Sequence, residues 1–217
     1  MTPSTLRTTL GLPHYGIEQL CCLGTLERET DEAIVYLRRT WSLTSGSVAE
    51  CNDAIVRRAT SGKPVSGTAR IGTAARRIGG RLKPWAPLLI AMMSGDLQFW
   101  LLPDRRSRDW PLLRRAMVRR SDLMKLEHLT FCRTDYPLFP FSPTMSLTDA
   151  RDMLNLGGAP THSLASVLGE DRPTAASVSS TQPKPNCLES RVGLSVASVL
   201  AASNRLISCG EISERTG

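Results

Sequence analysis

Aromatic residues are scarce in this chain of 217 residues, and several common features are missing altogether. Phe, Trp and Tyr make up only 5% of the sequence, which argues against a large aromatic-rich β-sandwich. No apolar stretch approaches the roughly 18 residues that suggest a transmembrane helix. The N-terminus lacks the charged start and apolar core of a signal peptide, so we expect a cytoplasmic protein with reduced cysteines.

Sequence patterns for metal binding and catalysis are also missing. The six cysteines include no Cys-x-x-Cys pair, and none of the three histidines has zinc-ligand spacing to a cysteine. The chain contains no P-loop, no Gly-x-Ser-x-Gly and no His-Glu-x-x-His motif. Its acidic residues are scattered among arginines, whereas a metal-dependent recombinase needs converging carboxylates. We therefore predict no cofactor, no metal site and no enzymatic activity.

Positive charge is abundant and is concentrated in the middle third of the chain. The net charge is +7, and residues 57–120 contain fifteen Lys or Arg against three Asp. The local balance is therefore +12, and the rest of the chain is net acidic at −5. This distribution favours a polyanionic partner, although a solvated face rich in arginine would give the same counts.

We expect DNA to be the partner of this basic region, because arginine matches phosphate and guanine edges well. The predicted DNA-binding residues are basic side chains of the middle third. They are Arg76, Arg77, Arg81, Lys83, Arg105, Arg106, Arg108, Arg114, Arg115, Arg119 and Arg120.

The apolar periodicity predicts a mainly α fold built of tandem helix-turn-helix units, some of them winged, with one or two short β-ribbons. The first unit covers residues 1–62. A short helix there ends at Gly11, Pro13 opens the next helix, and Gly24 stops it. Two further helices are expected at residues 31–39 and 48–59.

The second predicted unit, residues 68–130, is the basic one. Its first helix ends at the pair Gly79-Gly80, and its second starts near Pro84 or Pro87 and stops at Gly95. The segment "LQFWLLP" then has the composition of a strand, and we interpret it as a wing whose tip contains the arginines at 105, 106 and 108. Period-2 alternation would bury Phe99 and leave Trp100 partly exposed. A helix is expected after Pro111, then a short strand at "VRR" and a helix capped by Ser121.

The remaining segments have weaker patterns. Residues 142–170 form a third helix-turn-helix-like unit, in which Ser146 caps a helix and Asp149 stands three residues later. Residues 171–190 are rich in Ser, Thr and Pro, and we predict a disordered linker. Residues 191–217 contain a C-terminal helix.

One family has a similar order of motifs. "PLLIAMMSGDLQFWLLPDRRSRDWPLLRRAMVRRSDLMKL" followed by "MSLTDARDMLNL" resembles the C-terminal half of TniQ-type proteins, which help transposons choose their target. The resemblance covers roughly residues 5–170 and lacks that family's zinc fingers. It implies a non-catalytic protein that bridges DNA or a guide complex to a transposition ATPase.

The sequence thus predicts a DNA-binding adaptor, such as a transposition target-selection protein or another accessory protein of a mobile element. Two alternatives remain open. One is a protein-interaction scaffold that docks an acidic partner on its basic face, and the other is a transcriptional regulator.

Overall fold

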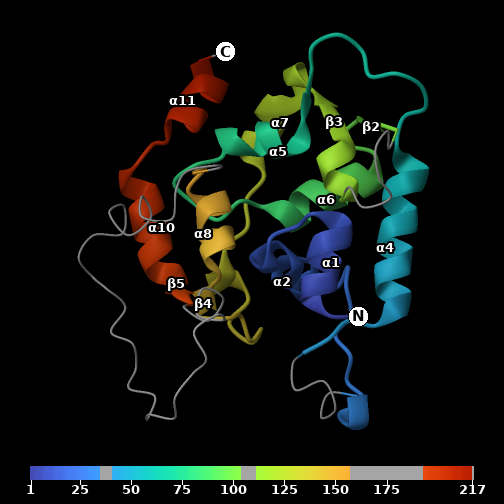
Figure 1. Cartoon of the computed structure of the whole chain (residues 1–217), viewed down its shortest axis with the longest axis vertical. Coiled ribbons are helices and arrows are strands. Elements are labelled where there is room, and N and C mark those ends of the chain that lie inside the picture. The colour runs from blue at the N-terminus through green and yellow to red at the C-terminus, as the bar shows by residue number, and fades with distance from the viewer. Residues whose placement is uncertain (35–40, 104–110, 157–192, 217) are drawn as a thin grey trace, which may run out of the picture.

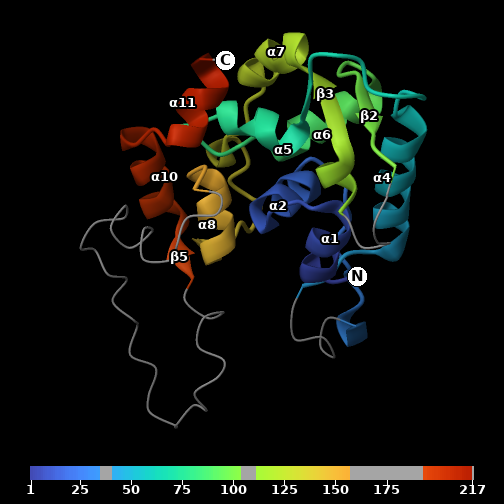
Figure 2. The same ribbon diagram turned by 45° about the horizontal axis from the view of Figure 1, so that its top comes forward.

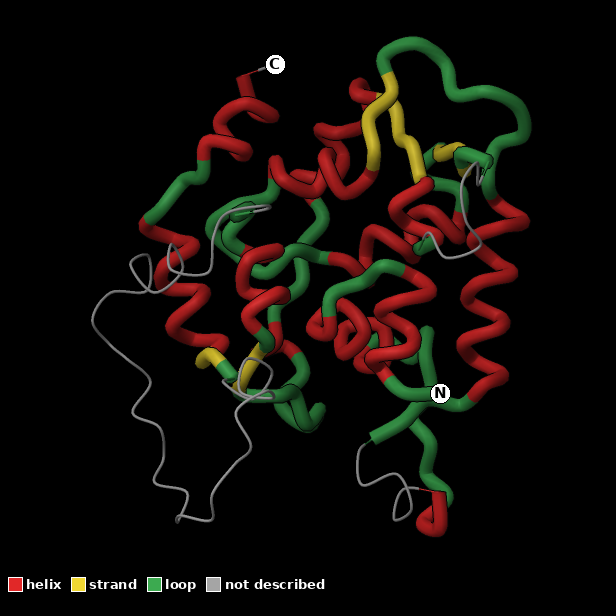
Figure 3. Tube along the Cα trace, viewed as in Figure 1, coloured by secondary structure: helices red, strands yellow, loops and turns green. Residues whose placement is uncertain are grey.

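The computed structural model describes residues 1–34, 41–103, 111–156 and 193–216, and these residues are mainly helical (Figure 3). The α-helices are α1 (Pro3–Leu10), α2 (His14–Cys22), α4 (Ser45–Arg58), α5 (Ile71–Ala74), α6 (Trp85–Ser94), α7 (Leu123–His128), α8 (Leu147–Met153), α10 (Val196–Arg205) and α11 (Cys209–Thr216). Short 3₁₀ turns complete the helical part: η1 (Ala75–Arg77), η2 (Leu112–Arg115), η3 (Arg120–Asp122) and η4 (Arg133–Asp135).

The helices start and stop at the local signals that the sequence contains. The Thr2 hydroxyl accepts a hydrogen bond from the Thr5 amide (3.2 Å), and α1 ends at Gly11, whose φ of 81° suits glycine. Pro13 precedes α2, and Gly95 (φ 94°) ends α6. Helix α8 begins at Ser146, whose hydroxyl accepts from the Asp149 amide at 3.1 Å. These predicted helix ends are confirmed.

Two small antiparallel sheets accompany the helices. Strands β1 (Thr68–Arg70), β2 (Phe99–Leu101) and β3 (Ala116–Arg119) form a sheet in the order β1-β3-β2. Strands β4 (Thr144–Met145) and β5 (Leu194–Ser195) form the second one. The predicted strand in "LQFWLLP" is confirmed.

The expected helix after Pro111 is wrong beyond Arg115. Only η2 is helical, and the chain becomes strand β3 at Ala116. Strand β3 is the central strand of its sheet, where Val118 stands opposite both Ala69 and Phe99. Its backbone groups are thus satisfied on both sides by strands distant in sequence, which outweighs the local helical pattern.

The expected exposure of Trp100 is also wrong, because Phe99 and Trp100 are only 1% and 2% exposed. The two rings lie on opposite faces of the sheet, as alternation requires. Trp100 is opposite Met117 in the register, and the Arg119 guanidinium lies 5.6 Å from the Trp100 ring centre. Both faces of β2 are therefore covered.

The helices surround one hydrophobic core. Helices α10 and α11 lie along one side of the molecule and α4 lies along the other (Figure 1), and the rotated view in Figure 2 keeps this order. The core contains buried apolar residues from all four described stretches, including Leu6, Leu89, Ala116 and Val199. The C-terminal segment is attached by backbone contacts as well, since the Val196 amide donates to the Pro143 carbonyl at 3.0 Å. The predicted linker at 171–190 lies outside the described residues.

Candidate functional site

The strongest candidate site is a cavity of about 380 Å³ whose wall is mostly basic. We call it the cationic pocket. Five of its residues are basic and one is acidic. It is lined by Arg70, Gly72, Thr73, Arg76, Lys83, Arg114, Arg151, Asp152 and Asn155.

The pocket is assembled from elements that are far apart in the sequence. Arg70 ends strand β1, where it stands opposite Met117 of β3. Arg76 belongs to η1, Arg114 to η2 and Arg151 to α8. Tertiary packing, rather than any local motif, therefore brings the four guanidinium groups to one cavity.

Close packing against α1 places η2, and with it Arg114. A Cβ atom at Gly11 would lie only 2.7 Å from the Cβ of Pro111, and Gly11 also has the left-handed φ of 81°. Glycine is required there on both grounds. The contact fixes the start of η2, because the Arg114 amide donates to the Pro111 carbonyl at 3.0 Å.

Lys83 is the buried cation of the pocket, with 2% of its surface exposed. Its ammonium donates to the backbone carbonyl of Asp152 and lies 3.9 Å from Oδ2 of the same residue. Burial lowers the pKa of Lys83 from its usual 10.5, and the Asp152 carboxylate opposes that shift. The nearby carboxylates of Asp152 and Glu211 thus only partly compensate for the desolvation of this charge.

Neighbouring side chains hold Lys83 and Asp152 in place. The buried Gln19 amide donates to the Lys83 carbonyl at 3.0 Å and accepts from the Ala86 amide at 3.1 Å. Tyr15 donates its hydroxyl to Asp152 Oδ2 at 2.8 Å. Burial, followed by the Asp152 charge, raises the pKa of Tyr15 well above its usual value, so this hydroxyl remains a donor.

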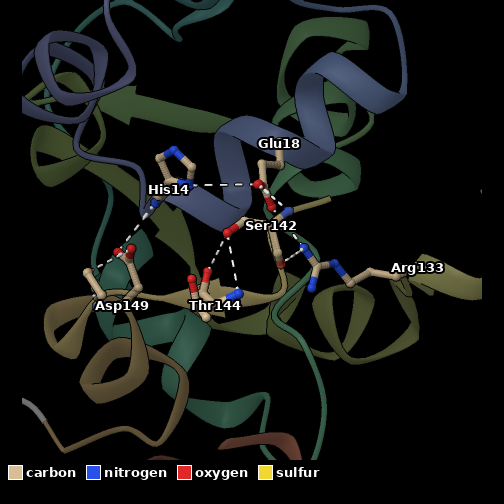
Figure 4. A network of polar contacts seen from close by, with 7 residues as sticks. His14, Glu18, Arg133, Ser142, Thr144 and Asp149 are labelled. Carbon is tan, nitrogen blue, oxygen red and sulfur yellow. Dashed lines mark hydrogen bonds and ion pairs between the residues drawn. The ribbon is translucent and has the colours of Figure 1, made fainter. Parts of the chain in front are cut away.

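A polar network fixes the helix that contributes Arg151 and Asp152 (Figure 4). Asp149 of α8 is 1% exposed, and its carboxylate accepts from the His14 amide (3.3 Å) and the Ser146 hydroxyl (2.9 Å). Buried Glu18 of α2 accepts from the Ser142 amide at 2.9 Å and from Arg133 at 3.0 Å. Helix α8 and the chain before it are thereby tied to α2.

Asn155 closes the pocket wall beyond the end of α8. It has a φ of 57°, a left-handed conformation that asparagine tolerates better than most residues. Its side-chain amide donates to the Arg76 carbonyl at 3.0 Å and to Glu211 at 3.3 Å. The end of α8, η1 and α11 are therefore linked through one side chain.

A second group of arginines adjoins another cavity, of about 500 Å³, and differs from the first in its partners. We call Arg77, Arg81 and Arg215 the paired cluster. Arg77 forms an ion pair with Glu127 at 2.9 Å, and Arg81 donates to the Glu127 backbone carbonyl. Arg215 forms an ion pair with buried Glu211 at 2.7 Å. The charges of this cluster are largely balanced within the fold.

The structure divides the predicted DNA-binding residues among several places. Arg76, Lys83 and Arg114 come together in the cationic pocket, while Arg77 and Arg81 belong to the paired cluster. Arg115 donates to the Leu102 carbonyl at 2.8 Å, Arg119 lies over Trp100, and Arg120 is exposed in η3. Arg105, Arg106 and Arg108, the proposed wing tip, lie outside the described residues.

Sequence reasoning missed Arg70 and Arg151. Arg70 was within the basic stretch but had no feature that separated it from its neighbours. Arg151 is in the net acidic part of the chain, on the helix capped by Ser146. The sequence signal for Arg151 is its i,i+4 spacing to Asn155, which places both on one side of α8 and its end. That spacing does not tell which partner they face.

In the ranges that the structure describes, no three His, Cys, Asp or Glu side chains converge as a metal site would require. No helix in those ranges is long and apolar enough to cross a membrane. Comparison of the chain with models of protein families, with curated proteins and with solved structures finds no match. The resemblance to TniQ-type proteins therefore stays a prediction.

Proposed function

We propose that this protein binds DNA through the phosphate backbone, with the cationic pocket as the main contact. The observation that carries the proposal is an imbalance of charge. Five basic side chains meet one carboxylate, and no ion pair joins Arg76, Arg114 or Arg151 to another described residue. Gathering like charges in one place costs free energy through mutual repulsion, which an anionic ligand offsets.

The order of elements from α4 to β3 supports a winged helix-turn-helix unit within this adaptor. A helix, a strand, two helical segments and two strands follow one another, and the last strand pairs between the other two. In this interpretation α6 occupies the position of the recognition helix, and strands β2 and β3 occupy those of the two strands that flank a wing. The predicted tandem arrangement would add the N-terminal and third units to this one.

The composition of α6 argues for backbone contacts rather than reading of bases. The helix "WAPLLIAMMS" contains no charged residue, and Trp85, Leu88, Leu89 and Met92 are buried. Base edges are read mainly by Arg, Lys, Asn and Gln, which α6 lacks. Contacts to phosphate position a protein on DNA without selecting a sequence. We therefore propose binding that depends little on base sequence.

The proposed role is that of a non-catalytic adaptor. A second partner, such as a transposition ATPase, is suggested by the TniQ-type resemblance alone. The competing proposal is a scaffold that docks an acidic protein on the same basic side chains. Polyglutamate separates the two, because it offers carboxylates without the regular phosphate spacing of DNA.

The test is a fluorescence anisotropy titration of a labelled duplex with three forms of the protein. The triple variant R76Q/R114Q/R151Q should bind at least about tenfold more weakly than wild type, since each lost charged hydrogen bond contributes roughly 1.5–3 kcal/mol. Arg57→Gln removes an exposed charge at the end of α4 and should bind like wild type. Equal binding by all three forms, or displacement of DNA by equimolar polyglutamate, would contradict the proposal.

A further inference from the structure

The cationic pocket is lined by residues of elements that are separate in the sequence. Residues from β1, α5, η1, η2 and α8 surround the cavity, and the buried Lys83 is among them. A nucleotide in the middle of a strand has neighbours on both sides, so the chain must enter and leave its binding site. A strand end has to enter only once.

The charge of the pocket exceeds what one internal phosphate would balance. Three of its arginines, Arg76, Arg114 and Arg151, carry positive charges that no described ion pair balances. An internal phosphodiester contributes one negative charge, whereas a phosphate monoester carries about −1.5 to −2 near neutral pH and offers three acceptor oxygens. Arg76, Arg114 and Arg151, none of which is in an ion pair with a described residue, match those three oxygens in number.

The residues that line the pocket do not suit recognition of a base. They are Arg, Lys, Gly, Thr, Asp and Asn, with no aromatic or aliphatic side chain among them. Proteins that hold unpaired bases commonly stack them on aromatic rings. The pocket thus provides donors for phosphate oxygens and no described surface on which a base would stack.

We infer that the cationic pocket takes the terminal phosphate monoester of a nucleic-acid strand. This inference rests on the proposed function and narrows it, from phosphate contact in general to strand ends. Arg76, Arg114 and Arg151 donate hydrogen bonds to the phosphate oxygens. Lys83, which Asp152 holds in place, adds a further positive charge. A free nucleotide has the same phosphate chemistry, so the experiment must separate these two sources.

The experiment compares two blunt duplexes of one sequence, labelled in the interior, with either 5′-phosphate or 5′-hydroxyl ends. The wild-type protein should bind the phosphorylated duplex about tenfold more tightly, as expected for at least one added charged hydrogen bond. Arg76→Gln and Lys83→Met should each abolish most of this preference. Arg151→Gln serves as a second surface variant if Lys83→Met does not fold, and Arg57→Gln should keep the full preference.

Adenosine 5′-monophosphate, titrated against the phosphorylated duplex, distinguishes the two sources. We expect it to compete far more weakly than an unlabelled phosphorylated duplex, because only the duplex adds contacts outside the pocket. Competition at equal concentration would assign the pocket to a free nucleotide and overturn the inference.

The failure of the inference differs from the failure of the proposed function. If both duplexes bind equally and the pocket variants weaken both, phosphate-backbone binding stands and the selection of ends is wrong. If neither duplex binds, the proposed function and this inference are both overturned.

Discussion

Arg76 and Arg77 are neighbours in η1, yet they belong to two basic regions that differ in how far acidic residues balance their charge. Arg76 faces the cationic pocket, where the described structure offers it no ion pair. Arg77 faces the paired cluster, where Glu127 lies 2.9 Å away. Both residues count equally in the net charge of the chain. The comparison shows that the number of arginines in a segment does not measure its capacity to bind an anion.

The two regions also differ in what their arginines do for the fold. In the paired cluster, ion pairs join η1 to α7 and close the turn of α11. In the cationic pocket, the polar network runs beneath the arginines, through Tyr15, Gln19 and Asp149. We therefore expect pocket variants to lose binding, and variants of the paired cluster to lose stability.

The largest expected effect is that of reversing one charge in the pocket. Arg76→Glu should weaken binding of a duplex by about 100-fold, because it removes an attraction and adds a repulsion at a concentrated positive site. Its melting temperature should stay close to that of wild type, since the Arg76 side chain is exposed. Anisotropy titration and thermal unfolding measure the two quantities. A loss of stability without a loss of affinity would reverse the roles of the two regions.

Removing the acidic partner from the paired cluster should have a smaller effect, and on stability. Glu127→Gln should lower the free energy of unfolding by about 1 kcal/mol, because the Arg77 and Glu127 side chains are 19% and 33% exposed and the ion pair is only partly desolvated. Denaturant unfolding gives this value. Duplex affinity should change little, and a tenfold gain or loss would show that this cluster also contacts DNA.

A third, still smaller effect concerns Lys83. Its lowered pKa means that the folded protein holds this proton less tightly than the unfolded chain, for which 10.5 is the usual pKa. The penalty is fully present below the lowered pKa and is relieved as the pH rises through it toward 10.5.

Lys83→Met should therefore raise the free energy of unfolding at neutral pH by about 1 kcal/mol or less, as replacement of a buried charge by an apolar side chain often does. The gain should shrink as the pH rises toward 10.5, because the wild-type penalty fades over that range. Urea unfolding at several pH values measures both trends. A clearly less stable variant at neutral pH would mean that Lys83 is a structural residue and not one retained for binding.

Local signals in the sequence predicted local structure well. Gly11, Pro13, Gly95 and Ser146 each act within one turn of the chain, and each ends or begins a helix where expected. The strand at residues 99–101 was likewise predicted from its composition. Such signals depend on backbone geometry and side-chain caps, which do not require knowledge of distant residues.

Features that depend on distant residues were predicted poorly. The local pattern predicted a strand only from Val118, and residues 116 and 117 belong to it because β1 and β2 flank β3. Trp100 is buried by residues of the neighbouring strand. Likewise, the basic middle third pointed to Arg76, Lys83 and Arg114, but Arg151 joined them only through the packing of α8 against α2. The ion pairs of the paired cluster depend on Glu127 and Glu211, and both residues lie outside the basic middle third of the sequence.

The salt dependence of DNA binding tests the central claim most directly. The logarithm of the binding constant falls with the logarithm of salt concentration by about 0.9 per phosphate contacted. The pocket variant R76Q/R114Q/R151Q should flatten this slope by about 1 if its three arginines hold one phosphate, and by about 2–3 if each contacts a phosphate of its own. The variant R77Q/R81Q/R215Q, which removes the same charge from the paired cluster, should leave the slope nearly unchanged. Equal slopes for the two triple variants would contradict the account.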